Sequence, residues 1–271
     1  MSRVPMTPAV SAKGVEVRLG GRLALGASDF DIPTGAVTAV IGPNGSGKST
    51  LLNVVAGLIA DYRGELEVLD EPQHGTRSDV SYVLQATKVN DRIPMSVFEV
   101  VLMGRYAGKR WLDRTTPADR QAVSDVLRRL DLYDLRRRSL HELSGGQRQR
   151  VFVAQGLVQD HHLLLLDEPA VGLDLNSAST IERVIAEERS RGQTVVFSTH
   201  DLAQALAADH ALLLAGRVVA AGPPSIALGH ENLELAYGLR VVQAADGRYM
   251  VDDPAHAAVG RRHIHRVPGR G

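Results

Sequence analysis

Hydrophobic positions along the chain follow two different spacings, which predict strands in some segments and helices in others. Short apolar runs bounded by turn-forming residues predict β-strands, and apolar residues repeated about every 3.6 positions predict helices. The predicted strands span residues 15–19, 23–32, 36–41, 65–69, 80–84, 163–167, 194–198, 211–214 and 217–221. The predicted helices span 49–58, 147–157 and 176–189, and helical periodicity also runs from 96 to 134. This alternation predicts an α/β fold with a mainly parallel sheet and helices on both faces.

The same pattern divides the chain into one large domain and two ends. We predict a flexible N-terminus over residues 1–13 and an α/β domain over 14–228, with an inserted helical subdomain at about 90–155. Residues 229–271 form a C-terminal extension. Its end, from 256 onward, is rich in arginine and histidine and poor in apolar residues, which predicts a disordered tail.

Composition restricts the functions open to this chain. Of 271 residues, 44% are apolar and 23% charged, as in ordinary globular proteins. Lysine plus arginine and aspartate plus glutamate both total 31, so the basic excess of a nucleic-acid-binding protein is missing and we predict no nucleic-acid partner. The absence of cysteine excludes disulfides and thiolate metal sites. No segment has the roughly 18 consecutive apolar residues of a membrane span, so we expect membrane association to come from a partner chain.

The strand predicted at 36–41 leads directly into a glycine-rich loop. The loop and the residue after it comprise Gly42, Pro43, Asn44, Gly45, Ser46, Gly47, Lys48, Ser49 and Thr50, which contain a full match to G-x-x-x-x-G-K-[ST]. A predicted helix follows, as a phosphate-binding loop requires. The glycines let backbone N–H groups point at a phosphate, Lys48 adds a positive charge, and Ser49 offers its hydroxyl to Mg²⁺. This motif predicts nucleotide binding.

Two adjacent carboxylates follow the apolar run at 163–166. Asp167 ends a buried strand, where an unpaired carboxylate would be costly, so we expect it to face the Mg²⁺ bound by Ser49. Glu168 points to the other face of the strand end and can act as general base toward an attacking water. The alternative is a helix-capping acid beside a surface acid.

A second pair of glycines lies at the start of a predicted helix. After Leu143, the residues Ser144, Gly145, Gly146 and Gln147 introduce the amphipathic run 147–157. A helix N-terminus with two glycines and a hydroxyl can bind an anion. Simple capping of the helix by Ser144 is the alternative.

The glycine loop, the Leu-Ser-Gly-Gly-Gln segment and the acidic strand end occur in one order, and together they resemble the ATP-binding cassette (ABC) ATPases from about residue 15 to 222. The resemblance implies a P-loop NTPase core with an antiparallel β edge and an inserted helical signature subdomain. It also implies hydrolysis of ATP with Mg²⁺. Two such chains are expected to pack head to tail, so that residues 144–147 of one chain close on the ATP held by the other.

Four further residues take roles only through this resemblance. Gln85 corresponds to the Q-loop glutamine, which contacts Mg²⁺ or water, and His200 to the switch histidine, which contacts the γ-phosphate and orients Glu168. Asp174 corresponds to the D-loop residue that crosses the dimer interface. Leu19 stands where the family usually stacks an aromatic ring on adenine, which predicts weak selectivity for that base.

The segment 93–106 resembles the corresponding segment of cassettes that power import of manganese, zinc, iron chelates or haem. This implies integral membrane permease subunits as partners, a solute-binding protein on the far side, and a peripheral location on the cytoplasmic face of the membrane. Two alternatives remain open. One is the ATPase subunit of an exporter, and the other is a soluble ABC ATPase that serves the assembly of a complex.

Overall fold

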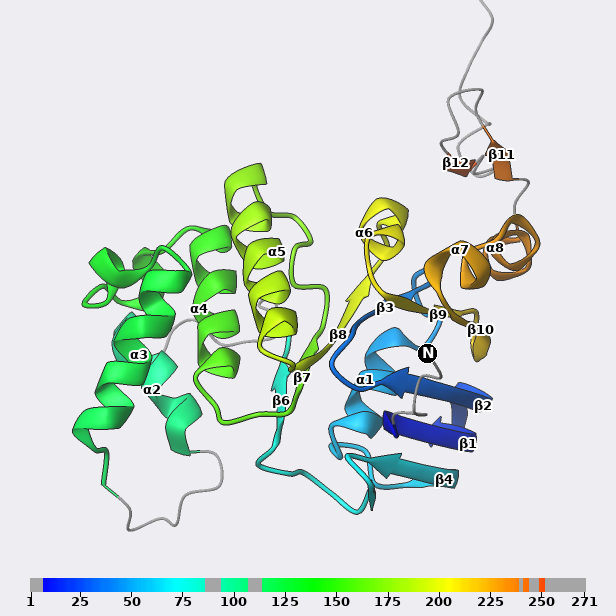
Figure 1. Ribbon diagram of the computed structural model, residues 1–271, viewed down its shortest axis with the longest axis horizontal. Coiled ribbons are helices and arrows are strands. Elements are labelled where there is room, and N and C mark those ends of the chain that lie inside the picture. Colours follow the sequence, from blue (N-terminus) through cyan, green and yellow to red (C-terminus); the bar gives the residue numbers. More distant parts are fainter. Residues whose placement is uncertain (1–6, 86–93, 107–113, 239–240, 244–248, 252–271) are drawn as a thin grey trace, which may run out of the picture.

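The computed structural model describes residues 7–85, 94–106, 114–238, 241–243 and 249–251. Figure 1 shows helices from the middle of the chain on one side and two large sheets on the other. One sheet has six strands and the second has four. The helix α1 (Lys48–Val55) lies between them and contributes to the core that they share.

The central sheet has the strand order β10-β9-β3-β8-β7-β6. Its strands are β3 (Val37–Ile41), β6 (Val80–Val83), β7 (Leu163–Leu166), β8 (Thr194–Thr199), β9 (His210–Leu214) and β10 (Val218–Gly222). All neighbours pair in parallel except β10, which closes one edge antiparallel to β9. Every residue of β3, β7 and β8 is buried, as expected for strands covered on both faces. The predicted mainly parallel sheet is confirmed.

Successive residues of β7 face two different hydrophobic cores. Leu163 and Leu165 pack with α1 and the four-stranded sheet. Leu164 and Leu166 pack with the helices on the opposite face. Because side chains alternate along a strand, a run of four leucines fills both cores and holds the strand end in a fixed position.

The four-stranded sheet is antiparallel, in the order β2-β1-β4-β5. It comprises β1 (Pro8–Leu19), β2 (Arg22–Pro33), β4 (Tyr62–Val68) and β5 (Glu71–Pro72). The prediction of a flexible N-terminus over 1–13 is wrong for residues 8–13. Val10 and Ala12 are buried and pair with both neighbouring strands, so this segment is an integral part of the sheet.

Most of the helices on the face of the central sheet opposite α1 come from the predicted inserted segment. They are α2 (Val97–Met103), α3 (Pro117–Arg129) and α4 (Gly145–Leu157), joined by the short 3₁₀ turns η2 (Gly104–Tyr106), η3 (Tyr133–Leu135) and η4 (Leu140–Glu142). Ser96, Thr116 and Ser144 begin the three helices with capping boxes, which fix where each helix starts. The helix α5 (Leu175–Ser190) lies beside α4 and packs against β8 and β3 of the central sheet (Figure 1).

The end of the chain contributes more to the folded body than the sequence predicts. After α6 (Leu202–Leu206), the chain forms α7 (Pro224–Ala227), α8 (His230–Tyr237) and a hairpin of β11 (Val241–Gln243) and β12 (Tyr249–Val251). Leu233 and Ala236 of α8 belong to the main core. The predicted boundary at 228 is therefore wrong, since α8 is part of the domain. The predicted disordered end from 256 onward lies outside the described residues.

No helix in the described part of the chain combines the length and apolar character needed to cross a membrane.

Candidate functional site

The glycine loop connects the end of β3 to the start of α1. Gly42 has no room for a side chain, because a Cβ there would lie 2.2 Å from the backbone oxygen of Leu214. Gly47 adopts a left-handed conformation with φ 102° and packs against β2, where a Cβ would lie 3.1 Å from the oxygen of Ala24. These restraints shape the loop into a cradle of backbone N–H groups.

The N-terminus of α1 differs from those of the neighbouring helices. Whereas α2, α3 and α4 begin with a side chain that caps the backbone, Gly47 supplies no side-chain cap to α1, and its first turn contains no acid. The positive end of the helix dipole therefore faces the loop. The hydroxyl oxygen of Ser46 is buried there and has no hydrogen-bond partner among the described residues. Both features fit a bound phosphate.

The ammonium group of Lys48 lies over the loop. It donates hydrogen bonds to the carbonyl oxygens of Gly42 at 2.8 Å and Pro43 at 3.1 Å. Burial lowers the pKa of Lys48, while the charges of Glu168 and Asp167 act in the opposite direction. The lysine thus lies between the phosphate cradle and the carboxylates at the end of β7.

Ser198 of β8 holds both of these acidic residues. Its hydroxyl donates to Asp167 Oδ1 at 2.7 Å and accepts from the backbone N–H of Glu168 at 2.8 Å. Asp167 is 2% exposed. Glu168 has φ 49°, in the left-handed region that costs energy for a residue other than glycine. The backbone turns sharply here, so the two adjacent carboxylates occupy different positions.

Gln85, which follows β6, contacts the predicted general base directly. Its side-chain N–H donates to Glu168 Oε2 at 3.0 Å. The sequence led us to expect Gln85 at Mg²⁺ or water, whereas in the structure its amide contacts the carboxylate of Glu168. A neutral amide donor can orient a general base without removing its ability to accept a proton.

The segment 144–147, called the signature segment from here on, and Asp174 lie against each other within one chain. Ser144 accepts from the N–H of Gln147, which in turn accepts from the N–H of Ser144. A Cβ on Gly146 would lie 2.6 Å from Ser177 Oγ and 3.1 Å from Asp174 Oδ2. Asp174 also caps α5, since its carboxylate accepts from the N–H and hydroxyl of Ser177. Gly145 has open space around its Cα.

His200 and Leu19 occupy exposed positions at two other edges. His200 directly follows β8, and no hydrogen bond joins it to Glu168 in the described part of the chain. Leu19 ends β1 and is 47% exposed. The structure thus brings together Gln85, Asp167, Glu168 and Lys48, while the roles predicted for His200 and Leu19 remain predictions.

Two residues beside the acids were missed by the sequence interpretation. Ser198 is a buried polar residue that follows the apolar run 195–197 of β8, which was the available signal. Tyr82 of β6 lies close to Asp167. Burial and the nearby carboxylate raise the pKa of its hydroxyl, so the tyrosine stays neutral. It carries no comparable sequence signal, because an aromatic residue in a strand most often fills a core.

The donor set suits Mg²⁺ that is bound mainly by phosphate and water. In the described residues, no group of three or more His, Cys, Asp or Glu side chains could hold a metal by itself. Mg²⁺ commonly uses one or two protein oxygens together with substrate phosphates. Ser49 at the start of α1 and Asp167 at the end of β7 can supply those oxygens. The fold and site together define a nucleoside-triphosphate-binding P-loop protein.

Comparisons with known proteins identify the family. A family model described as ABC transporter matches residues 25–171. The manganese transport system ATP-binding protein MntB of Listeria monocytogenes is 34% identical over 236 residues, which cover 87% of this chain and 98% of MntB. The zinc transport system ATP-binding protein TroB of Treponema pallidum is 38% identical over 237 residues, which cover 85% of this chain and 89% of TroB.

Two solved structures extend the comparison. A chain assigned to a metal-chelate type ABC transporter in an inward-facing conformation has a TM-score of 0.78 and 29% identity, covering 93% of this chain and 100% of that chain. The ATP-binding cassette MJ0796, a dimer in a post-hydrolysis state with ADP and phosphate, has a TM-score of 0.69 and 25% identity, covering 79% and 98%. The chain belongs to the ABC transporter family. Within that family it is an ATP-hydrolysing cassette subunit.

Proposed function

We propose that this chain powers the import of a transition metal ion or metal chelate through a separate membrane permease. The observation that carries the enzymatic part is the contact of Gln85 with Glu168 beside Lys48 and Asp167, because it joins a phosphate site to an oriented base. The names of the manganese and zinc relatives, together with the segment 93–106, support the choice of metals.

Each residue of the site has a chemical task in this proposal. Lys48 and the loop N–H groups bind the phosphates of ATP. Ser49 and Asp167 hold Mg²⁺, which when bound neutralises charge on the phosphate oxygens. Glu168 accepts a proton from the attacking water. Gln85 orients the Glu168 carboxylate, and His200 approaches the γ-phosphate.

The proposal includes a second chain at each site. The N-terminus of α4 has two glycines and a capping serine, but its own chain places it against Asp174 and Ser177. An anion bound there would come from a partner cassette packed head to tail. Such a dimer would dock on permease subunits at the cytoplasmic face of the membrane, with a solute-binding protein on the far side and no nucleic acid.

Export and a soluble role in complex assembly are the competing functions. Gene context separates them: a permease with a solute-binding protein supports import, and a permease alone favours export. The absence of any permease gene would favour the soluble role.

The direct test uses the chain reconstituted in liposomes with the permease and binding protein encoded beside it. ATP hydrolysis should rise when Mn²⁺, Zn²⁺ or a ferric siderophore is supplied with the binding protein on the side opposite the ATPase. The metal should then accumulate on the side that holds the ATPase and ATP. The same complex with Glu168→Gln should lose about 10²-fold or more of this hydrolysis. Metal accumulation away from the ATP side, or stimulation without a binding protein, would contradict import.

A further inference from the structure

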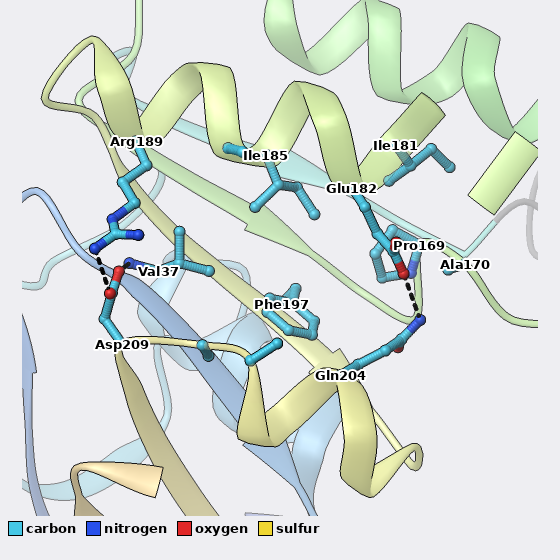
Figure 2. A pocket seen from close by; sticks show the side chains of 13 residues that line it. Val37, Pro169, Ala170, Ile181, Glu182, Ile185, Arg189, Phe197, Gln204 and Asp209 are labelled. Carbon is cyan, nitrogen blue, oxygen red and sulfur yellow. Dashed lines mark hydrogen bonds and ion pairs between the residues drawn. The ribbon is translucent and has the colours of Figure 1, made fainter. Parts of the chain in front are cut away.

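An apolar cavity of about 210 Å³ lies between α5 and α6, away from the glycine loop. Figure 2 shows Ile181 and Ile185 of α5 on one wall and Phe197 of β8 on another. Gln204 of α6 faces Glu182 of α5 across one end of the cavity. An ion pair between Arg189 and Asp209 crosses the other end. The hydrogen bond between Gln204 and Glu182 thus connects α6 to α5 at the edge of the cavity.

Gln204 uses both ends of its amide. Its Oε1 accepts a hydrogen bond from the Thr199 hydroxyl at 2.8 Å, and its Nε2 donates to Glu182 Oε1 at 3.3 Å. The hydroxyl of Thr199 also accepts from the backbone N–H of Asp201 at 3.0 Å. One glutamine therefore links the chain on both sides of residue 200 to α5.

We propose that Gln204 is a positioning residue for His200 in ATP hydrolysis. His200 lies between Thr199 and Asp201, and both neighbours belong to the hydrogen-bonded chain that ends at Gln204. On the far side, Glu182 lies on α5, whose first turn is capped by Asp174. The proposal rests on the role given to His200 under the proposed function.

The amide is suited to this position in a way that other side chains are not. Thr199 presents a donor and Glu182 presents an acceptor, so the linking group needs one acceptor and one donor. Leucine has a similar size but neither group. Glutamate would accept from Thr199, but it would place a second carboxylate beside Glu182. The hydrogen bond from Thr199 is partly buried, whereas the one to Glu182 lies at the surface, so the bond to Thr199 is the harder one for water to replace.

The first test is Gln204→Leu in the full-length chain, assayed for ATP hydrolysis. Misplacing a reacting group by 1 Å can cost about 10²-fold, so loss of this anchor should lower kcat about tenfold and leave KM for ATP within about twofold. Thr199→Val removes the same hydrogen bond from the other side and should give a similar loss. The two losses should not add in the double variant.

A charge-neutral exchange provides the rescue. In the double variant Glu182→Gln with Gln204→Glu, the new carboxylate at 204 accepts from Thr199, and the new amide at 182 donates to that carboxylate. Its kcat should therefore be close to that of the original chain and well above that of Gln204→Leu. The matched control is Gln121→Leu on α3, where the exposed amide donates to Asp125. That variant should keep the original kcat.

The decisive background is His200→Ala. If Gln204 acts through His200, adding Gln204→Leu to His200→Ala should slow hydrolysis by less than about twofold. A tenfold additional loss from Gln204→Leu in the His200→Ala chain would overturn the positioning role alone. The same conclusion would follow if His200→Ala slowed hydrolysis while Gln204→Leu and Thr199→Val both kept the original kcat. An unchanged kcat in His200→Ala would instead refute the role proposed for His200.

Discussion

Glu168 is held at two points, in a backbone conformation that few residue types adopt. Its N–H is bound by Ser198, and its carboxylate is bound by Gln85 from a different strand end. At φ 49° the backbone pays a local energetic cost, and the hydrogen bonds to neighbouring strands offset it. The carboxylate is thereby placed before substrate binds, which lowers the cost of orienting it during hydrolysis.

Leu19 provides the residue-scale prediction, because it replaces an aromatic ring at the expected adenine position. It lies at the end of β1, and Leu25 on the paired strand β2 contacts Gly47 of the loop. With little stacking on the base, binding should depend on the phosphates, so ATP and GTP should have similar affinities. Leu19→Tyr should tighten ATP binding by up to about 1 kcal/mol, the lower end of the stacking range. Titration of both nucleotides measures this.

Leu23→Tyr serves as the control for added aromatic surface. Leu23 is also exposed on the same hairpin, at 55%, and pairs with Arg18. It should leave both affinities unchanged. A strong preference for ATP in the original chain, unaltered by Leu19→Tyr, would show that another residue contacts the adenine.

At the scale of elements, α3 is joined to α5 by a network of ionisable side chains that are buried or partly buried. Arg129 donates to Glu187 at 2.9 Å and to Glu188 at 2.6 Å, and His161 Nε2 lies 3.4 Å from Glu188. Burial by itself would raise the pKa of Glu188, but His161 and Arg129 outweigh it and lower the pKa to about 2. This network holds α3 of the inserted segment against α5, which packs on the central sheet.

The lowered pKa of Glu188 predicts a pH-dependent contribution to stability. The usual pKa is near 4.5, so the contribution is complete above that value and is lost as the pH falls toward 2. Glu188→Gln should lower the free energy of unfolding at pH 7 by about 1–3 kcal/mol. Urea unfolding should show this difference shrinking between about pH 5 and 3.

The exposed pair of Asp125 and Arg128 on α3 is the matched control. Their side chains are 55% and 51% exposed, so Asp125→Asn should change stability little at any pH. A Glu188→Gln deficit that stays constant from pH 7 to 3 would contradict the role assigned to this carboxylate.

Sequence patterns predicted the elements that have strong local signals. The strand at 36–41, the glycine loop and the run of leucines at 163–166 were located from residue types alone, because buried parallel strands and tight loops restrict composition. Other features depend on tertiary contacts. The strand at 8–13 is stabilised by pairing on both sides, and α8 by packing of Leu233 and Ala236 into the core. The hydrogen bond from Gln85 to Glu168 joins positions far apart in the sequence.

For the whole molecule, the two proposed anion sites, the glycine loop and the signature segment, belong to different parts of the fold. The glycine loop joins β3 to α1 beside the sheets, and the signature segment begins α4 in the helical group (Figure 1). Within the chain, Gly146 contacts Asp174 and Ser177 instead of the loop. The central claim is therefore that hydrolysis takes place at sites composed from two chains.

Mixing two inactive variants tests this claim most directly. Lys48→Ala removes the phosphate-binding lysine, and Ser144→Arg blocks the signature, so each variant alone should be inactive. In a mixed head-to-tail dimer, the loop of the Ser144→Arg chain meets the signature of the Lys48→Ala chain and forms one intact site. An equal mixture should recover up to about a quarter of the original rate, because random pairing makes about half the dimers mixed and each has one intact site of two. No hydrolysis in verified mixed dimers, or full activity of either variant alone, would contradict the composite site.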